Sequence, residues 1–228
     1  MHRSWLLVST ALWLLPAGLF AGTQDGVSVS LHIQAHAVKA IQICDTATPN
    51  AQGLVCEAYQ TQWPTHAPGD LYLVVTTGDP GPGIAGLSCG IAYPPNLSMS
   101  GWELCADLEF PNGSWPASGG GNRITWAAGV NCQTTVIPGY EYYGVHAVAG
   151  AFYVYAYGSG LFEITDNLGI AVPELKVADC NASESDVNYL PAKVGFGVAQ
   201  GYNACVLCKP GCSPVERTTW GALKTGYR

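Results

Sequence analysis

Apolar and polar residues alternate along the chain from Val27 onward, in the stretch VSVSLHIQAHA. Valine, leucine, isoleucine and alanine fall on one face of this stretch, and serine, histidine and glutamine fall on the other. A period of two residues over this length is typical of a β-strand with one buried face. We therefore predict a strand whose other face is exposed to water and carries Ser28, Ser30, His32, Gln34 and His36.

Short apolar or alternating segments recur along the rest of the chain, separated by turns rich in glycine and proline. Gly150 and the Gly-Ser-Gly at 158–160 predict hairpin corners. Almost no segment has a helical period, so the pattern predicts an all-β fold, an antiparallel β-sandwich or jelly roll. The other predicted strands are 71–77, 84–92, 123–128, 142–148, 151–157, 161–165, 174–178 and 193–199.

The two ends of the chain differ from the segment between them. A positive charge at Arg3, an apolar run over 5–15 and small residues near Ala21 predict a secretory signal peptide over 1–21. A membrane-spanning helix needs about 20 apolar residues, and no segment reaches that length, so we expect no transmembrane anchor. One β-sandwich domain is expected over 23–207, followed over 208–228 by a turn and a basic, aromatic tail.

Composition narrows the class of protein. Only 11% of the 228 residues are charged and 48% are hydrophobic, which argues against a disordered chain. Residues 22–208 hold fifteen acidic residues against Lys39, Arg123, Lys176 and Lys193. Because such a surface repels phosphate backbones, nucleic acid is not expected as a partner.

Nine cysteines behind a predicted signal peptide indicate an oxidising compartment and a disulfide-stabilised fold. Sequence does not fix the pairing, but local spacing favours bridges from Cys44 to Cys56, from Cys105 to Cys132 and from Cys180 to Cys205. The spacing Cys205-x-x-Cys208-x-x-x-Cys212 lacks a fourth ligand for zinc or an iron–sulfur cluster, so no metal or cofactor is expected. The disulfide candidates are Cys44, Cys56, Cys105, Cys132, Cys180, Cys205, Cys208 and Cys212.

Catalytic candidates are weak. The segment 86–90 matches G-x-S-x-G, with Ser88 as a possible nucleophile and Asp107 and His146 as partners in chain order. The motif requires a helix directly after the serine, and here Pro94-Pro95 follows closely. On a strand, Asp107 and Glu109 would share a face at a separation that suits an inverting glycosidase pair, about 6.5–9.5 Å. His32 and His36 would lie ~13 Å apart along a strand, too far for one metal ion.

Aromatic side chains are the more informative group. Tyr153, Tyr155 and Tyr157 alternate with Phe152, Val154 and Ala156, so one sheet face carries a row of three phenols. Rings on a rigid sheet can stack on sugars or form a protein interface, or they can fill the core. Tryptophans in predicted loops join the candidate ligand-binding group at Trp63, Trp102 and Trp115.

The last residues carry a separate signal. Beyond Cys212 the charge becomes positive, and a short helix would place Trp220, Leu223 and Tyr227 on one face with Lys224 and Arg228 beside them. Ten residues are too few to hold a helix alone in water, so the tail is expected to order on a partner.

The ending Thr219-Trp220-Gly221-Ala222-Leu223-Lys224-x-x-Tyr227-Arg228 resembles a tail, roughly T-W-G-x-[IL]-K-x-x-Y-R, that closes many uncharacterised secreted bacterial proteins. The segments GWELCADLEF and VGFGVAQGYNAC also resemble cysteine-containing β domains of such proteins. This resemblance implies export and sorting, and it brings no known activity. Gly226 departs from the pattern, which has an apolar residue there.

Three functions follow from these features, with the oligomeric state left open. The first is a secreted or cell-surface β-sandwich with a structural, adhesive or binding role, more a binding protein than an enzyme, whose partner is a glycan or a cell-surface protein. The second is a carbohydrate-binding module or glycan-active hydrolase that uses the Tyr/Trp surface. The third and most distant is a serine hydrolase at Ser88.

Overall fold

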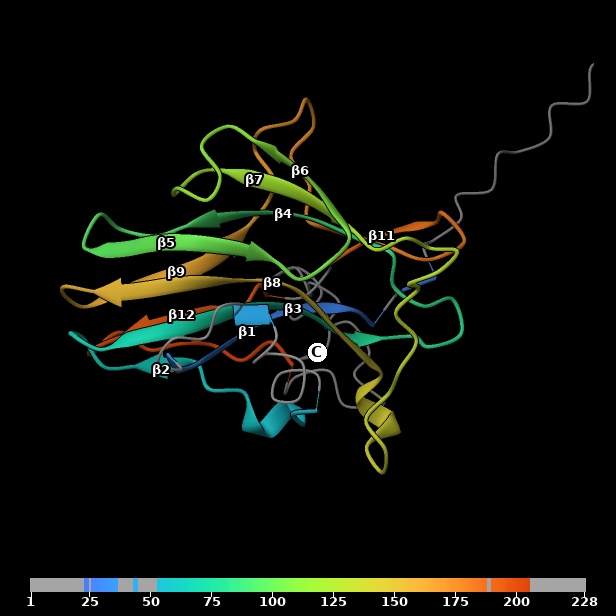
Figure 1. The fold of residues 1–228 in the computed structure, drawn as a ribbon, viewed down its shortest axis with the longest axis horizontal. Coiled ribbons are helices and arrows are strands. Elements are labelled where there is room, and N and C mark those ends of the chain that lie inside the picture. The colour runs from blue at the N-terminus through green and yellow to red at the C-terminus, as the bar shows by residue number, and fades with distance from the viewer. Residues whose placement is uncertain (1–22, 25, 37–42, 45–52, 188–189, 206–228) are drawn as a thin grey trace, which may run out of the picture.

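The computed structural model describes residues 23–24, 26–36, 43–44, 53–187 and 190–205, which are the coloured parts of Figure 1. The predicted signal peptide over 1–21 and the predicted tail over 208–228 lie outside the described residues, as do Cys208 and Cys212. Within the described part of the chain, no helix is long and apolar enough to cross a membrane.

The smaller of two sheets has four antiparallel strands in the order β1-β3-β8-β5. The long central strands β3 and β8 pair along most of their length, with a register shift between Leu73 and Val74. This sheet consists of β1 (Ser28–Ala35), β3 (Pro68–Gly78), β8 (Val145–Ala156) and β5 (Leu97–Leu104).

The larger sheet has eight strands, six of them in the order β11-β10-β4-β9-β12-β2. β7 pairs with β4 and carries β6 on its other edge. All pairs are antiparallel except the short pair of β2 and β12. The strands are β2 (Gln62–Trp63), β4 (Gly86–Ala92), β6 (Leu108–Asn112), β7 (Gly121–Thr125), β9 (Gly160–Thr165), β10 (Lys176–Ala178), β11 (Glu184–Asp186) and β12 (Lys193–Phe196).

The main core lies between the two sheets and confirms the predicted disulfide-stabilised β-sandwich. Alternate residues of each strand point inward, for example Leu31 and Leu73 from the smaller sheet and Ile91 and Phe162 from the larger one. All four are fully buried. The two inner faces supply the apolar contacts that hold the layers together, as expected for packed sheets.

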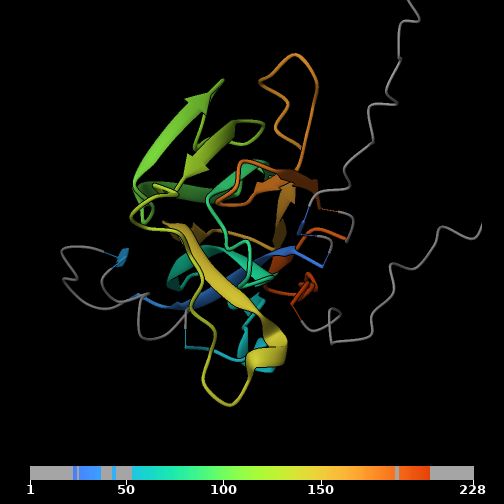
Figure 2. The same cartoon turned by 90° about the vertical axis from the view of Figure 1, so that its right-hand side faces the viewer.

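A second core covers part of the outer face of the smaller sheet. Tyr72 and Val74 of β3 and Val148 of β8 pack there against two segments, one with η1 (Cys56–Ala58) and one with η2 (Glu141–Tyr143). Figure 1 shows both 3-10 turns on the same side of the molecule, below the strands labelled β1 and β3, and Figure 2 shows the same arrangement from the side. The second core consists of Ile43, Cys56, Tyr59, Tyr72, Val74, Tyr143, Val148, Ala151 and Cys205.

The second core corrects one prediction about β1. The alternation correctly predicts the strand, but Ser28, Ser30 and His32 are buried rather than exposed. The serine hydroxyls hydrogen-bond to Thr76 at 2.9 and 2.8 Å, and the backbone N–H of Gln60 donates to His32 Nδ1 at 3.0 Å. Polar residues on this face are therefore satisfied within the protein.

The two predicted hairpin corners also differ from the structure. Gly150 lies inside β8, which runs from Val145 to Ala156. A glycine is needed there because the ring of Trp102 occupies the space where a side chain would stand. The turn at 158–160 does reverse the chain, but it connects β8 of one sheet to β9 of the other. The pattern does not predict β2, β5, β6 or β11.

Candidate functional site

The tyrosine row of β8 lies on the outer face of the smaller sheet, beside the second core. Tyr153 and Tyr155 are half-buried, and Tyr157, directly after the strand, is 64% exposed. The rings of Tyr155 and Tyr157 meet edge to face with centroids 4.9 Å apart. The row predicted from the alternation is therefore present and reaches solvent at its far end.

Two histidines from other parts of the chain join this row. The His36 ring meets the Tyr153 ring edge to face at 4.9 Å, and the His66 ring meets Tyr155 at 6.4 Å. His36 is half-buried and His66 is exposed. We name this set the aromatic–histidine face: His36, His66, Tyr153, Tyr155 and Tyr157.

A buried carboxylate holds His36 in place. Asp70 lies opposite Tyr153 in the pairing of β3 with β8, and its side chain is fully buried. His36 Nδ1 lies 2.8 Å from Asp70 Oδ1, and in the tautomer with a proton on Nδ1 the ring N–H donates to the carboxylate oxygen. Asp70 Oδ2 is buried and has no hydrogen-bond partner among the described residues. The carboxylate therefore orients the imidazole and is not itself presented to solvent.

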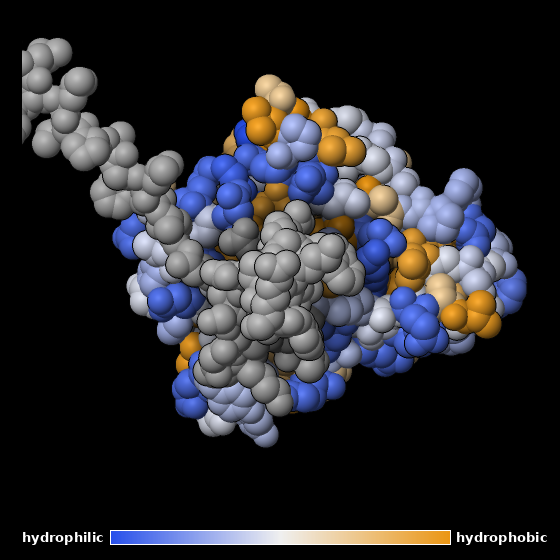
Figure 3. Space-filling view, turned by 180° about the vertical axis from the view of Figure 1, so that it is seen from behind, coloured by the Kyte–Doolittle hydropathy of each residue, from blue (hydrophilic) through white to orange (hydrophobic). Residues whose placement is uncertain are grey.

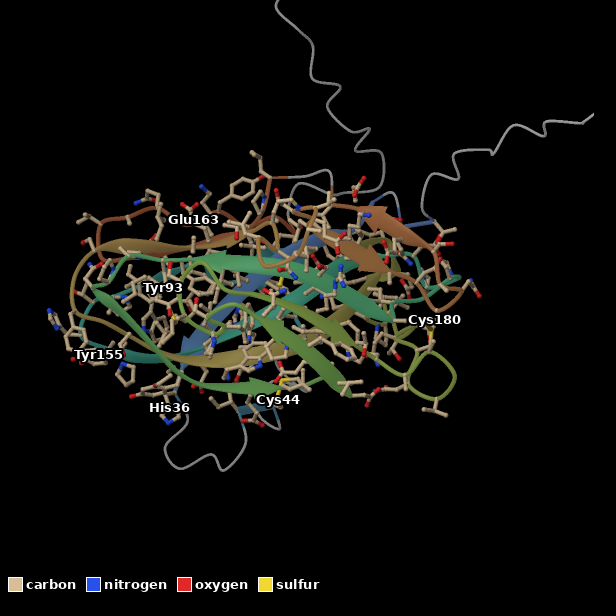
Figure 4. The ribbon with its side chains drawn as sticks, turned by 90° about the horizontal axis from the view of Figure 1, so that it is seen from above. His36, Cys44, Tyr93, Tyr155, Glu163 and Cys180 are labelled. Carbon is tan, nitrogen blue, oxygen red and sulfur yellow. A yellow bond between two sulfur atoms is a disulfide. The ribbon has the colours of Figure 1, made fainter. Side chains whose placement is uncertain are left out.

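The β5 residues opposite Tyr153 and Tyr155 are uncharged. Ser98 and Ser100 of β5 lie opposite Tyr155 and Tyr153, and both serines are exposed. Figure 4 shows His36 and Tyr155 at one end and on one side of the molecule, with Glu163 on the opposite side. In the space-filling view from behind, the apolar residues that are visible form separate small groups, mainly at the top and on the right of the picture (Figure 3).

The three tryptophans do not extend this face, which corrects the predicted Tyr/Trp surface. Trp102 packs against Trp115 at 5.0 Å and against Phe152 at 4.6 Å, so these rings close one end of the main core. Trp63 also packs on the core and donates its ring N–H to the Ala67 carbonyl at 3.2 Å. The tryptophans therefore have a packing role in the described structure.

The residues of the predicted serine triad are not brought together. Ser88 lies inside β4 and projects from the outer face of the larger sheet, where it pairs with Lys176 and Arg123 across the strands. His146 projects from the outer face of the smaller sheet into the second core. Asp107 is an exposed loop residue that accepts from the Ala127 N–H at 2.7 Å. No strand-to-helix elbow follows Ser88 in the described chain.

Asp107 and Glu109 do not form a carboxylate pair open to a substrate. Glu109 accepts from Trp102 Nε1 at 2.8 Å and from Asn122 Nδ2 at 2.7 Å, so it is oriented into the protein. Asp107 accepts from the Ala127 backbone and from Asn131, and these two hydrogen bonds lower its pKa. Each acid thus has a structural partner of its own.

A shallow cavity of about 90 Å³ opens at Ser88 on the outer face of the larger sheet. Glu174 forms ion pairs there with Arg123 at 3.2 Å and with Lys176 at 3.6 Å. Burial acts to raise the pKa of Glu174, but hydrogen bonds with Ser88 and Arg123 and the nearby cations lower it overall. The Ser88 hydroxyl therefore hydrogen-bonds to the Glu174 carboxylate, which also forms ion pairs with Arg123 and Lys176.

A larger cavity of about 500 Å³ lies near the start of β9, between Tyr93, Leu161, Glu163 and Val198. Glu163 is its one carboxylate among the described residues, and Lys193 pairs with it at 3.1 Å. A single neutralised acid does not supply the pair that glycoside hydrolysis requires. The aromatic–histidine face remains the better candidate site.

Disulfides join Cys44 to Cys105, Cys56 to Cys205 and Cys132 to Cys180, so six of the predicted candidates are paired but all three predicted pairings are wrong. The bridges connect residues 48 to 149 positions apart, because the sheets bring distant segments together. Figure 4 shows Cys44 near the middle of the molecule and Cys180 at the end opposite Tyr155. Among the described cysteines, Cys89 is free and buried in the core.

One group of three potential metal ligands occurs among the described residues: Cys56, Cys205 and His146. All three are buried in or beside the second core. His146 Nε2 lies 3.9 Å from Cys56 Sγ and 3.8 Å from Cys205 Sγ. Burial lowers the pKa of His146 to about 4, so the imidazole is neutral at pH 7. His32 and His36, considered as a chelating pair, belong to no such group in the described chain.

His66 and Asp70 were not predicted as site residues. His66 is part of a short turn with positive φ, and Asp70 stands near the start of β3. Neither has a sequence motif. The contact of Asp70 depends on the strand register, and the contact of His66 depends on where its turn lies relative to Tyr155. Trp220, Leu223, Lys224, Tyr227 and Arg228 of the predicted tail lie outside the described residues.

The chain matches no family model and no curated protein. Solved structures that resemble it at low identity include three cohesin modules. One is a cohesin module from a Clostridium perfringens family 33 glycoside hydrolase, with 6% identity, a TM-score of 0.43, and 75% of this chain and 98% of that chain covered. A cohesin in a type I cohesin–dockerin complex from Clostridium thermocellum has 11% identity and a TM-score of 0.43, over 60% and 89% of the two chains. The sixth cohesin of Acetivibrio cellulolyticus scaffoldin B, in complex with a Cel5 dockerin, has 7% identity and a TM-score of 0.44, over 75% and 98%. None of these likenesses assigns the chain to a family.

Proposed function

We propose that this chain is an exported, disulfide-stabilised binding or adhesive module that holds its ligand on the aromatic–histidine face. The observation that carries the proposal is the convergence of Tyr153, Tyr155 and Tyr157 with His36 and His66 on one outer face. These side chains come from three separate segments of the chain. Aromatic rings with polar edges are enriched where proteins bind ligands.

Two properties of the aromatic–histidine face support a binding role, its rigidity and its polarity. Tyr153 and Tyr155 project from the central strand β8, and His36 is fixed by Asp70, so little side-chain freedom is lost on binding. Among the described residues, Asp70 Oδ2 has no hydrogen-bond partner, which is uncommon for a buried polar atom.

A binding role is favoured over catalysis because each candidate catalytic group has another task. Ser88 supports Glu174, Asp107 accepts from a backbone N–H, and Glu109 accepts from Trp102. His146 lies in the second core beside a disulfide. The five residues of the aromatic–histidine face include no carboxylate, so the face does not supply the acid pair that glycoside hydrolysis requires.

We favour a neutral glycan as the ligand because of the residues beside the tyrosine row. The described neighbours of the tyrosine row on β5 are Ser98 and Ser100, so the row combines ring faces with hydroxyl groups. Sugar rings stack on flat aromatic faces and exchange hydrogen bonds with hydroxyls. These contacts require no charge on the ligand, which fits a neutral glycan.

A glycan array tests the glycan proposal with the mature chain. The native protein should bind at least one neutral glycan, and Tyr153→Ser/Tyr155→Ser/Tyr157→Ser should not. Tyr140→Ser/Tyr142→Ser is the matched control, because these two exposed tyrosines lie on and beside η2, outside the face. Equal binding by the native chain and the triple variant would show that the glycan does not bind to the aromatic–histidine face.

We also propose that residues 208–228 direct the module to its place of attachment. The support is the basic, aromatic composition of this segment and its resemblance to tails of secreted bacterial proteins. Deleting residues 213–228 should leave urea unfolding of the domain unchanged and release the protein from its normal location. A deletion variant that fractionates like the native protein would contradict the sorting role.

A further inference from the structure

Two sulfur atoms and one imidazole nitrogen converge in the second core. Cys56 Sγ, Cys205 Sγ and His146 Nε2 all lie within 4.8 Å of one another, and the two sulfurs form a disulfide. No comparable group surrounds the other two bridges within the described chain. The Cys56–Cys205 pair therefore has a neighbour with ligand chemistry that Cys44–Cys105 and Cys132–Cys180 lack.

We propose that Cys56, Cys205 and His146 bind Zn²⁺ when their disulfide is reduced, so that a metal ion and a disulfide are alternative links at this position. Two thiolates and an imidazole are ligands that zinc prefers. With Zn–S near 2.3 Å and Zn–N near 2.1 Å, tetrahedral geometry separates ligand nitrogen and sulfur by about 3.6 Å. The observed separations of 3.9 and 3.8 Å are close to this value, so mainly the two sulfurs must move apart.

The orientation of His146 suits a ligand. Its Nδ1 lies 3.2 Å from the Tyr59 hydroxyl, while its Nε2 faces the two sulfurs. A metal-bound histidine usually donates its other ring N–H to a fixed acceptor, which sets the tautomer. Tyr59 is buried and meets the imidazole edge to face at 5.7 Å, so it can serve as that acceptor.

The chemistry balances with a dithiol as the reductant. Thiol–disulfide exchange breaks the Cys56–Cys205 bond, transfers two electrons and two protons to the pair, and leaves the dithiol oxidised to a disulfide. Zn²⁺ then displaces the two thiol protons, and His146 supplies a neutral nitrogen. A water molecule would complete the four positions. Either link joins η1 to the end of the described domain.

The test uses the mature chain with Cys208→Ser and Cys212→Ser, so that thiols near the C-terminus do not compete. After reduction with a phosphine under argon, Co²⁺ should bind at one equivalent, with a thiolate charge-transfer band and the visible bands of a tetrahedral site. Zn²⁺ should displace it. The oxidised protein should show neither band.

Matched variants assign the ligands. Cys56→Ser/Cys205→Ser should abolish the Co²⁺ bands, and His146→Ala should weaken binding by about tenfold or more, in line with the loss of a metal-site contact. Cys132→Ser/Cys180→Ser and His32→Ala should keep the bands, because they remove a different sulfur pair and a different buried histidine. Unchanged bands in His146→Ala, or bands lost with Cys132 and Cys180, would overturn the proposal.

A second measurement needs no substitution at the site, so misfolding of a variant cannot obscure the answer. Zn²⁺ should slow alkylation of Cys56 and Cys205 in the reduced protein at least tenfold, as read by peptide mass spectrometry, and should leave alkylation of Cys132 and Cys180 unchanged. Equal alkylation of all four cysteines with and without Zn²⁺ would contradict a site here.

Discussion

The outer face of the smaller sheet has two regions built from the same strands, and they differ in what covers them. Around His32 and Tyr72 the face is buried under the second core, where His32 is 6% exposed. Four residues further along the chain, directly after β1, His36 is 26% exposed at its side chain and contacts Tyr153. The alternation is the same in both regions. Burial is decided by η1, η2 and Cys205, which come from distant parts of the chain.

This difference assigns different roles to similar residues. In the second core, Tyr72 accepts from Gln34 Nε2 at 2.9 Å and donates to the Ile43 carbonyl at 3.3 Å, so its hydroxyl contributes to stability. On the aromatic–histidine face, Tyr157 is largely exposed. We expect changes in the second core to reduce the free energy of unfolding, and a change at the exposed Tyr157 of the face to reduce binding alone.

Acid should destabilise the second core most. Burial lowers the pKa of His32 and of His146 to about 4, whereas the unfolded imidazole has a pKa near 6.5. Between these values the unfolded chain binds more protons, so the free energy of unfolding falls as the pH falls from about 6.5 to about 4. The shift corresponds to roughly 3 kcal/mol for each imidazole. Urea unfolding at pH 7, 5.5 and 4.5 measures it.

The double variant His32→Asn/His146→Asn is the control for this pH dependence. Its free energy of unfolding should vary less between pH 7 and pH 4.5, whatever its absolute stability. Lowered pKa values of Glu174 and Asp179 add further losses only at lower pH. A native protein equally stable at pH 7 and pH 4.5 would contradict the neutral, buried state of these histidines.

Removing the disulfide of the second core should have the next largest effect. Cys56→Ser/Cys205→Ser is expected to lose roughly 2 to 5 kcal/mol, because the bridge closes a long stretch of chain and holds η1 against the sheet. Urea unfolding under non-reducing conditions gives the value. A loss below about 0.5 kcal/mol, the range of ordinary surface substitutions, would show that the second core does not depend on this bridge.

A smaller effect is expected from the Tyr72 hydroxyl. Tyr72→Phe keeps the ring and removes the hydrogen bonds to Gln34 and Ile43, which should cost about 1 kcal/mol. Tyr155→Phe is the control on the open region, with an expected change near zero. Equal costs for the two variants in urea unfolding would mean that the two regions are not distinct in stability.

The smallest change in stability is predicted on the face itself. Tyr157→Ser should alter the free energy of unfolding by no more than about 0.5 kcal/mol, since the ring is 64% exposed. Its loss should nevertheless weaken glycan binding. A destabilisation above about 1 kcal/mol would indicate that Tyr157 is part of the packing.

Local patterns in the sequence predict most of the strands, but they do not predict which distant residues pack against those strands. The alternation of Val29, Leu31 and Ile33 identifies β1 and its core face correctly. The same alternation gives no sign that Ser30 and His32 lie under a second core, because the covering residues are remote in sequence. The prediction of a corner at Gly150 is wrong for a similar reason. This glycine makes room for the ring of Trp102 of β5, which is remote in sequence.

The candidate site is predictable only in part. Period two places Tyr153, Tyr155 and Tyr157 in a row, and the structure confirms that row. His36 was on the same predicted face as His32, but its contact with Asp70 depends on the register of β1, β3 and β8. Disulfide pairing failed because spacing favours near neighbours, whereas Cys56 pairs with Cys205 through the fold.

Binding of the labelled mature chain to isolated cell envelopes of the organism that encodes it tests the central claim most directly. The account predicts saturable binding that Tyr153→Ser/Tyr155→Ser/Tyr157→Ser abolishes and Tyr140→Ser/Tyr142→Ser preserves. Protease treatment of the envelopes should leave binding intact if the ligand is a glycan and remove it if the ligand is a protein. Equal binding by the native chain and the triple tyrosine variant would contradict the account.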